Sequence, residues 1–308
     1  MTALTQSAPS SSWQSWEYES SVPGGVVVGV DGSPESIAAL NSASPIGKAR
    51  HCPVHVVSVI PPFPSYHLDP GVDASRENVE QLRVQLRDSA IADLLKAADV
   101  GTEWSREVVL GRPARMITMA AEKRGASLIV IGRRRHGLMD RILGGETTLQ
   151  VMRLSSVPVL AVAGEMDTVR TVVVATDFSP SSVRAARVAL DMMGRSGMLY
   201  LVFVEPPVPL YPEGFAMPDE VRYPGDVVVW FRRMIEVLKA PPEIIVEPVV
   251  LNGKPVQAVV EFAERVGADM IAAGTHGHNR MERFLLGSVS TGLVRNADCA
   301  VLVAPAAE

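Results

Sequence analysis

The chain is an internal repeat, and this feature restricts its possible folds more than any other. Five segments of the first half recur in the same order in the second half. The matched pairs are 25–34 (GVVVGVDGSP) with 171–180 (TVVVATDFSP), 54–62 (VHVVSVIPP) with 199–207 (LYLVFVEPP), 109–113 (VLGRP) with 251–255 (LNGKP), 127–132 (SLIVIG) with 269–274 (DMIAAG) and 157–162 (VPVLAV) with 298–303 (DCAVLV). The offset stays between 141 residues (Val157 to Asp298) and 146 residues (Gly25 to Thr171). Such a pattern indicates two duplicated domains.

The periodicity of each repeat predicts strands that alternate with helices. Short runs of Val, Ile and Leu, such as 26–28 and 128–131, have no polar alternation, which is typical of strands buried on both faces of a parallel sheet. The pairs Ser33-Pro34 and Ser179-Pro180 each begin a helix, with serine as the N-cap and proline at the first helical position. Strands alternating with helices predict the α/β class with a doubly wound, Rossmann-like sheet in each domain.

Two helices of the first repeat carry more specific expectations. Pro45 predicts a kink or an early end in the helix that begins at Pro34, because proline lacks an N–H and clashes with the preceding turn. Residues 77–98 predict an amphipathic helix. The apolar residues of that helix are Leu82, Leu86, Ile91, Leu94 and Leu95.

Length and composition set the domain organisation. A chain of 308 residues is long enough for two domains. Residues 1–24 are rich in Ser, Gln and Pro and predict a disordered tail. We expect the first domain at 25–166 and the second at 168–308.

Charge and hydropathy exclude some classes of partner. The net charge is −5, which argues against a nucleic-acid partner because such proteins usually carry a basic patch. No apolar run approaches the ~18 residues of a membrane span, so no membrane partner is expected. The first residues lack the basic start and apolar stretch of a signal peptide, and Cys52 and Cys299 suit small buried hydrophobes. We therefore expect a cytoplasmic protein.

A glycine-rich segment of the second repeat carries the chemistry. Gly274-Thr-His-Gly277 is followed after nine residues by Gly287-Ser288-Val289-Ser290. Gly274 ends an apolar strand, and Gly287-Ser288 begins the next helix. Glycines let the backbone approach phosphates, and the helix N-terminus adds a partial positive charge. The segment predicts a cradle for an anion that needs no lysine.

This pattern resembles the universal stress protein family in its tandem, two-domain form. The family pattern is G-x2-G-x9-G-(S/T), with an aspartate closing the first strand, and here that aspartate is Asp177. The resemblance covers residues ~25–163 and ~170–305. It implies a five-stranded parallel sheet flanked by helices in each domain. It also implies that the fifth strands, at Val157–Val162 and Ala300–Val303, pair within the chain as a pseudo-dimer.

The resemblance to the ATP-binding branch assigns roles to residues of the second repeat. It places Asp177 and the main chain of Val204 at the adenosine end. It places Ala273, Gly274 and Gly277 along the ribose and phosphate loop. The phosphates would be bound by Gly287, Ser288, Val289 and Ser290. The implied ligand is ATP, with Mg²⁺ left open as its companion.

The first repeat departs from this pattern at two positions. Arg135 stands in place of the second glycine, and Glu146 stands in place of the phosphate-binding serine. A carboxylate at a helix N-terminus suits the helix dipole but repels phosphate, so the first site is predicted to be weak or empty for ATP. Its residues are Asp31, Val59, Ile131, Gly132, Gly145, Thr147 and Thr148. Two ways in which the first site could still bind ATP stay open. Arg133–Arg135 could bind phosphate from outside the loop, or Arg135 could pair with Glu146.

The sequence does not supply the groups of a fast enzyme. His276 and His278 lie two residues apart without an obvious third ligand, so no metal site is predicted. No catalytic residue is predicted, and at most weak ATP hydrolysis is expected. Three functions stay open: a nucleotide-dependent regulatory switch in the stress response, which the intact second loop favours, a slow ATPase, and a structural stress module that binds no nucleotide. Expected partners are an adenine nucleotide, an unknown protein and, through other surfaces, a second copy of the chain.

Overall fold

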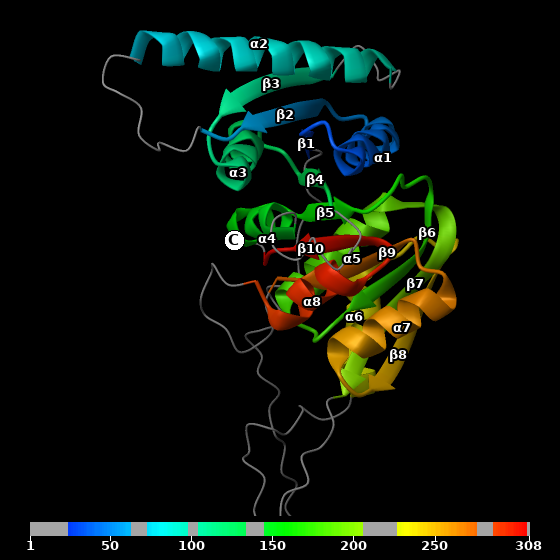
Figure 1. Ribbon diagram of the computed structural model, residues 1–308. Helices are drawn as coiled ribbons and strands as arrows, with labels where there is room; N and C mark the ends of the chain where they lie inside the picture. Colours follow the sequence, from blue (N-terminus) through cyan, green and yellow to red (C-terminus); the bar gives the residue numbers. More distant parts are fainter. Residues whose placement is uncertain are drawn as a thin grey trace, which may run out of the picture.

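The computed structural model describes residues 24–62, 73–97, 104–133, 145–205, 227–275 and 286–306. The predicted disordered tail, residues 1–24, lies outside these ranges except for its last residue. Within them the chain alternates strands and helices in two successive sets (Figure 1). The alternation that the hydrophobic pattern predicts is confirmed.

The elements of the two halves follow the same order. The first half contains β1 (Val26–Gly29), α1 (Pro34–Arg50), β2 (Val54–Ile60), α2 (Asp73–Ala97), β3 (Ser105–Leu110), α3 (Pro113–Lys123), β4 (Leu128–Gly132), α4 (Gly145–Leu154) and β5 (Val159–Val162). The second half contains β6 (Val169–Ala175), α5 (Pro180–Met192), β7 (Met193–Glu205), α6 (Val227–Leu238), β8 (Ile244–Asn252), α7 (Pro255–Val266), β9 (Met270–Gly274), α8 (Ser288–Asn296) and β10 (Ala300–Ala304).

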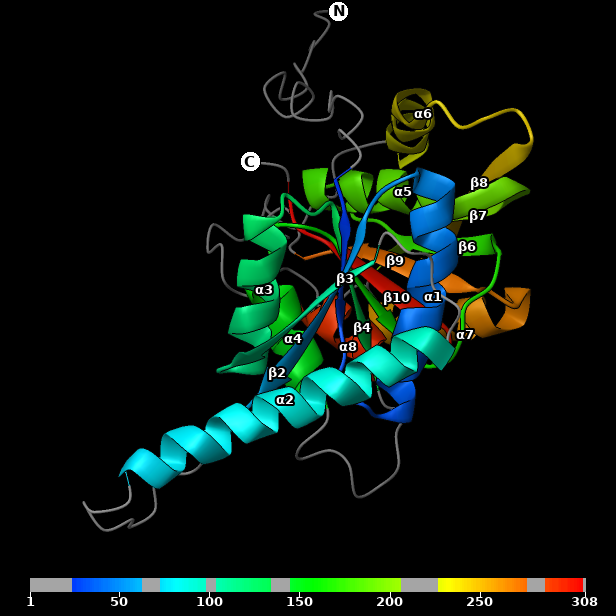
Figure 2. The same ribbon diagram turned by 90° about the horizontal axis from the view of Figure 1, so that it is seen from above.

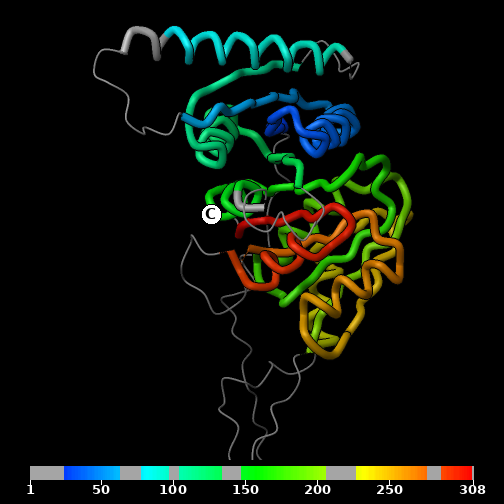
Figure 3. The backbone as a smooth tube through the Cα atoms, in the orientation of Figure 1, coloured from blue at the N-terminus to red at the C-terminus, as the bar shows by residue number. Residues whose placement is uncertain are grey.

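All described strands form one continuous sheet, in the order β3-β2-β1-β4-β5-β10-β9-β6-β7-β8. Within each half, neighbouring strands run parallel. The halves meet where β5 and β10 pair antiparallel, with Leu160 opposite Leu302. The predicted pairing of the two fifth strands within one chain is therefore confirmed, and the tube trace shows these strands side by side at the join (Figure 3).

Helices cover both faces of this sheet, and each face has its own apolar core. On one face, α1, α2, α5 and α6 pack residues such as Leu40, Ile91 and Met234 against the strands. On the other face, α3, α4, α7 and α8 contribute residues such as Met152 and Leu293. Strand residues alternate between the two cores, as the apolar runs without polar alternation require.

The predicted helix starts are confirmed in both repeats. Ser33 is the N-cap of α1 and accepts a hydrogen bond from the Ser36 N–H at 3.2 Å. Ser179 does the same for α5, with the Ser182 N–H at 3.3 Å. These caps fix where each helix leaves the carboxyl end of its strand.

Two expectations about the first repeat are met only in part, although the helix predicted at 77–98 is present as α2. Helix α1 does not end early at Pro45 but continues to Arg50, because proline removes only its own N–H and the remaining turns pack on the sheet. On α2, Leu82 and Leu86 are 53% and 63% exposed, whereas Ile91 is buried. The helix extends beyond the edge of the sheet (Figure 2), so only its later turns have strands to cover.

Candidate functional site

The predicted site residues gather at the carboxyl ends of adjacent strands, where open α/β sheets bind ligands. In the first half, Asp31 follows β1 and Gly132 ends the neighbouring β4. In the second half, Asp177 follows β6, Gly274 ends the neighbouring β9, and Val204 lies near the end of β7. Each set is brought together at one edge of its half-sheet.

Close helix packing requires the first glycine of each loop. A Cβ at Gly132 would lie 2.4 Å from the main-chain carbon and oxygen of Glu35 at the start of α1. A Cβ at Gly274 would lie 2.8 Å from the main-chain carbon of Ser181 at the start of α5. These glycines therefore let the helix that follows the first strand approach the fourth strand closely.

The two aspartates support the turns that lead into these helices. Asp31 Oδ1 accepts hydrogen bonds from the Ser33 N–H at 2.9 Å and from the Ser33 hydroxyl at 2.6 Å. Asp177 Oδ1 accepts one from the Ser179 N–H at 3.0 Å. Burial raises the pKa of Asp31, but hydrogen bonds from Ser33 and Ser36 and the charge of Arg87 outweigh it and hold this pKa below its usual value. Asp31 is thus an ionised acceptor at neutral pH.

In both halves, a hydroxyl of the helix that follows the fourth strand donates to the last residue of that strand. The Ser290 hydroxyl donates to the Gly274 carbonyl oxygen at 2.6 Å, and the Thr148 hydroxyl donates to that of Gly132 at 3.3 Å. Gly287, the N-cap of α8, donates its N–H to the Thr275 carbonyl oxygen at 2.8 Å and supplies no side-chain cap. The first turn of α8, at Ser288 and Val289, is therefore not capped by the side chain of its N-cap residue.

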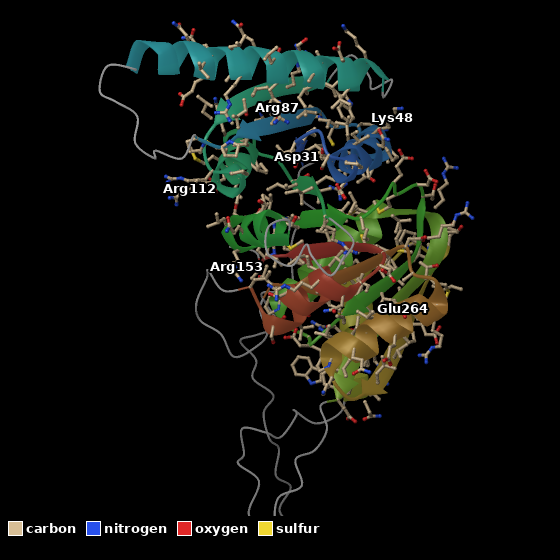
Figure 4. The ribbon with its side chains drawn as sticks, in the orientation of Figure 1. Asp31, Lys48, Arg87, Arg112, Arg153 and Glu264 are labelled. Carbon is tan, nitrogen blue, oxygen red and sulfur yellow. The ribbon has the colours of Figure 1, made fainter. Side chains whose placement is uncertain are left out.

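A cavity of about 450 Å³ lies at the first carboxyl edge. Six of the seven residues predicted for the first site line it: Asp31, Val59, Ile131, Gly132, Thr147 and Thr148. Arg87 of α2 also lines it and donates a hydrogen bond to the main-chain oxygen of Asp31 (Figure 4). Gly145, the remaining predicted residue, is the first residue of α4.

A second cavity, of about 550 Å³, lies between α7 and α8. Its lining includes Lys254, Val256, Gln257, Glu261, Ser288, Val289 and Asn296. Lys254 is the N-cap of α7. The arrangement places a lysine beside the uncapped first turn of α8, two features that attract an anion.

Sequence reasoning missed Arg87, Lys254 and Glu35 as lining residues of these cavities. Lys254 could have been found, because it lies inside the repeated Gly-(Arg/Lys)-Pro segment. Glu35 lies in the first turn of α1, where acidic residues are common because they suit the helix dipole, so its position gives no separate signal of a lining role. Arg87 has no local signal, since only the packing of α2 over β2 and β3 brings it near Asp31.

Several predicted residues lie outside the described part of the chain. These are Gly277, His276, His278, Arg134 and Arg135, and for Glu146 only its place in α4 is described. Of the cluster Arg133–Arg135, which was expected to be able to bind phosphate, the structure describes only Arg133. The Arg133 side chain is buried and donates to the carbonyl oxygens of Val294, Ala297 and Cys299 in the second half. It therefore serves the contact between the domains and is not directed at a phosphate.

Within the described ranges, no group of three or more His, Cys, Asp or Glu residues is placed to hold a metal ion. None of the helices in these ranges combines the length and apolar character needed to cross a bilayer.

Comparisons with known proteins match this architecture. The sequence profile of the universal stress protein family matches residues 25–163 and again 168–305. Universal stress protein Rv1996 of Mycobacterium tuberculosis is 29% identical over 305 residues, which cover 91% of this chain and 94% of that protein. The crystal structure of a universal stress protein from Archaeoglobus fulgidus covers 92% of this chain and 98% of its own, with 25% identity and a TM-score of 0.63.

A further solved relative is a universal stress protein in complex with cAMP. It is 28% identical, covers 46% of this chain and has a TM-score of 0.35. The two profile matches span both repeats, and the Archaeoglobus structure spans both halves of the sheet. The chain therefore belongs to the universal stress protein family and carries two copies of the domain that defines it.

Proposed function

We propose that the protein is an ATP-binding regulatory protein of the stress response, and that its second domain holds the nucleotide. The observation that carries this proposal is the position of Lys254 beside the first turn of α8. Ser288 and Val289 line the same cavity, and Gly287 supplies no side-chain cap. A cation and an uncapped helix N-terminus together favour a phosphate group.

The adenosine end would lie at the neighbouring strand ends. Asp177 follows β6, and Val204 lies near the end of β7. Ala273 and Gly274 end β9, which pairs with β6 on its other side. In this arrangement the base of the nucleotide would lie on one side of Gly274 and its phosphates on the other. A Mg²⁺ ion bound with ATP would be held mainly by the phosphates and water, as is usual for this ion.

Helix α8 gives such a site a route to regulation. Its first turn belongs to the proposed phosphate site, and Arg133 of the first domain holds the carbonyl oxygens at its other end. Binding at the start of α8 therefore acts on a helix that both domains position. A difference in nucleotide affinity between two positions of α8 would shift their populations.

The first experiment is to purify the protein without added nucleotide, denature it and quantify the nucleotide released. About one ATP or ADP per chain supports the second site alone, and about two contradicts the predicted weakness of the first site for ATP. If none is released, excess ATP is added and melting is followed. At 100 times its dissociation constant a ligand stabilises its domain by about 2.7 kcal/mol, which raises Tm by roughly 5–10 °C.

Two variants locate the site. Lys254→Gln and Ser288→Ala should each weaken ATP binding about tenfold, because each removes a donor to a charged phosphate. The control is Lys48→Gln, since Lys48 lies in the last turn of α1 and far from this cavity (Figure 4). If neither release nor melting detects nucleotide, the protein is a structural module of the family. Turnover that Ser288→Ala abolishes would indicate a slow ATPase.

A further inference from the structure

We infer that the cavity of the first domain binds an uncharged nucleoside and rejects polyphosphates. Its ligand would offer hydroxyl and amino hydrogens to carboxylates of the chain. This inference rests on the proposed function, because it takes the same edge of the sheet as a nucleotide-type site. It gives the two domains different ligands.

The cavity presents strong acceptors. Asp31 and Glu35 both line it. Asp31 is ionised, since its pKa lies below the usual value. The Oε2 atom of Glu35 has almost no contact with solvent and accepts no hydrogen bond from the described residues. A buried acceptor without a donor is unfavourable, and a ligand hydroxyl or amino group at the Glu35 carboxylate would supply that donor.

Three of the four hydroxyl side chains that line the cavity donate within the chain, and Thr147 is the fourth. Ser33 donates to Asp31 at 2.6 Å, Ser36 donates to the Ser33 carbonyl oxygen at 2.9 Å, and Thr148 donates to the Gly132 carbonyl oxygen. Arg87 uses part of its guanidinium on the main-chain oxygen of Asp31. A phosphate needs several donors at once, and these groups offer it few.

The two repeats also differ in the first turns of the helices at their carboxyl edges. The helices that start at the first carboxyl edge carry Glu35 and Glu146 in their first turns, whereas the matching positions in the second repeat are Ser181 and Ser288. A helix N-terminus attracts anions. In the first domain Glu35 therefore provides a carboxylate at one helix start, and the sequence has a glutamate where the second repeat has Ser288. Both differences disfavour a phosphate and favour an uncharged ligand.

The cavity also has the size and the apolar walls that a base requires. Its volume is about 450 Å³, within the range of small-molecule sites. Val59, Ile117 and Ile131 line it together with the acceptors. These side chains would contact the base while the carboxylates receive hydrogens of the sugar.

The test isolates the first site in the full-length chain. Ser288→Glu copies Glu146 into the second repeat and removes phosphate binding there. With this variant freed of nucleotide, calorimetric titrations measure adenosine and ATP separately. We expect adenosine to bind at least tenfold more tightly than ATP. Adding Glu35→Gln should weaken adenosine about tenfold, because a charged acceptor is lost, whereas Glu122→Gln on the exposed face of α3 should have no effect.

The opposite substitutions, made in the first repeat, test whether ATP binding can be gained there. Glu35→Ser with Glu146→Ser copies the second repeat into the first and should raise ATP affinity at least tenfold in the same background. Circular dichroism checks the fold of each variant, and Asp31→Asn replaces Glu35→Gln if the latter fails to fold.

Three results would overturn the inference. These are equal affinity of the Ser288→Glu chain for ATP and adenosine, no adenosine binding at millimolar concentration, and unchanged adenosine affinity after Glu35→Gln. In each case ATP binding by the unaltered chain, lost on Ser288→Glu, would leave the proposed function intact. If the unaltered chain binds neither ligand, both proposals fail.

Discussion

The guanidinium of Arg133 lies 2.5 Å from the carbonyl oxygen of Ala297, so a side chain of the first domain holds the end of a helix in the second. The same group donates to Cys299 at 2.6 Å and to Val294 at 3.4 Å. Carbonyl oxygens at a helix C-terminus carry partial negative charge, and a cation there is stabilising. Arg133 therefore joins the two domains at the last described residue before Gly145.

Arg133→Ala should lower the free energy of unfolding by about 2–4 kcal/mol, because it leaves buried carbonyl oxygens without their donor. Urea unfolding followed by circular dichroism measures the change. Arg153→Ala is the matched control: Arg153 is exposed on α4 (Figure 4), so its loss should change stability by less than about 0.5 kcal/mol. Equal effects of the two substitutions would show that the Arg133 contacts contribute nothing.

Cys299 reports on the same contact through its thiol. Burial raises the pKa of Cys299 to about 11, against the opposing effect of the Arg133 charge. An ordinary thiol has a pKa of about 8.5, so at pH 8 the thiolate fraction of Cys299 should be more than 100-fold lower. Iodoacetamide labelling followed by mass spectrometry should find it protected in the native chain. Arg133→Ala removes a charge that lowers this pKa, so faster labelling in that variant would show that the thiol has become exposed. Rapid labelling of the native chain would contradict the expected protection.

His55 should make stability depend on pH. Burial lowers the pKa of His55, aided by the charges of Arg124 and Lys123, although Glu107 acts in the opposite direction. Its Nδ1 lies 2.8 Å from the Ser105 hydroxyl, and its Nε2 lies 3.1 Å from Glu107 Oε1. Between this lowered pKa and the ordinary value of about 6.5 the unfolded chain binds more protons than the folded chain. The contribution is therefore complete above pH ~6.5 and is lost as the pH falls.

The measurement compares urea midpoints at pH 7.5 and 5.5. His55→Gln should lose less stability on acidification than the unaltered chain. His51→Asn, at an exposed histidine that ends α1 in the left-handed conformation, is the control, since asparagine tolerates that conformation. An unchanged pH dependence in His55→Gln would show that this histidine titrates alike in both states.

Gly132→Ala should lower stability by about 2–3 kcal/mol, because the new methyl group meets the main chain of Glu35 at 2.4 Å and α1 must move. Gly29→Ala is the control in the same sheet. Its methyl would meet only the end of the Ile117 side chain, at 3.0 Å, and should cost under about 1 kcal/mol. Thermal melting of the two variants measures the difference, and a harmless Gly132→Ala would show that α1 does not need this close approach.

The sequence predicted the strand and helix order, because repeats and apolar runs are local signals, whereas the pairing of β5 with β10 was implied only by the resemblance to the family. It did not predict the course of α1 beyond Pro45 or the exposure of Leu86, since both depend on which strands lie beneath the helix. The direction of Arg133 was equally out of reach. Within a run of three arginines it looks like part of a basic turn, and only the antiparallel join brings α8 within its reach.

The candidate site could likewise be predicted only in part from the sequence. Asp31 and Gly132 lie where the repeat pattern predicts, because strand ends follow from the strands themselves. Arg87 and the orientation of Glu35 depend on how α1 and α2 pack against the sheet, and no spacing in the sequence encodes that packing.

The antiparallel join of β5 and β10 has a consequence for inheritance. Two identical chains that met along this edge would have to share every substitution, so their sites could not diverge. Covalent linkage frees each copy to change independently while every molecule still contains one of each. The two halves could therefore come to differ at Glu35 and Glu146, where the second repeat has serines. Each molecule nevertheless contains one site of each kind, so the ratio of the two sites does not depend on expression.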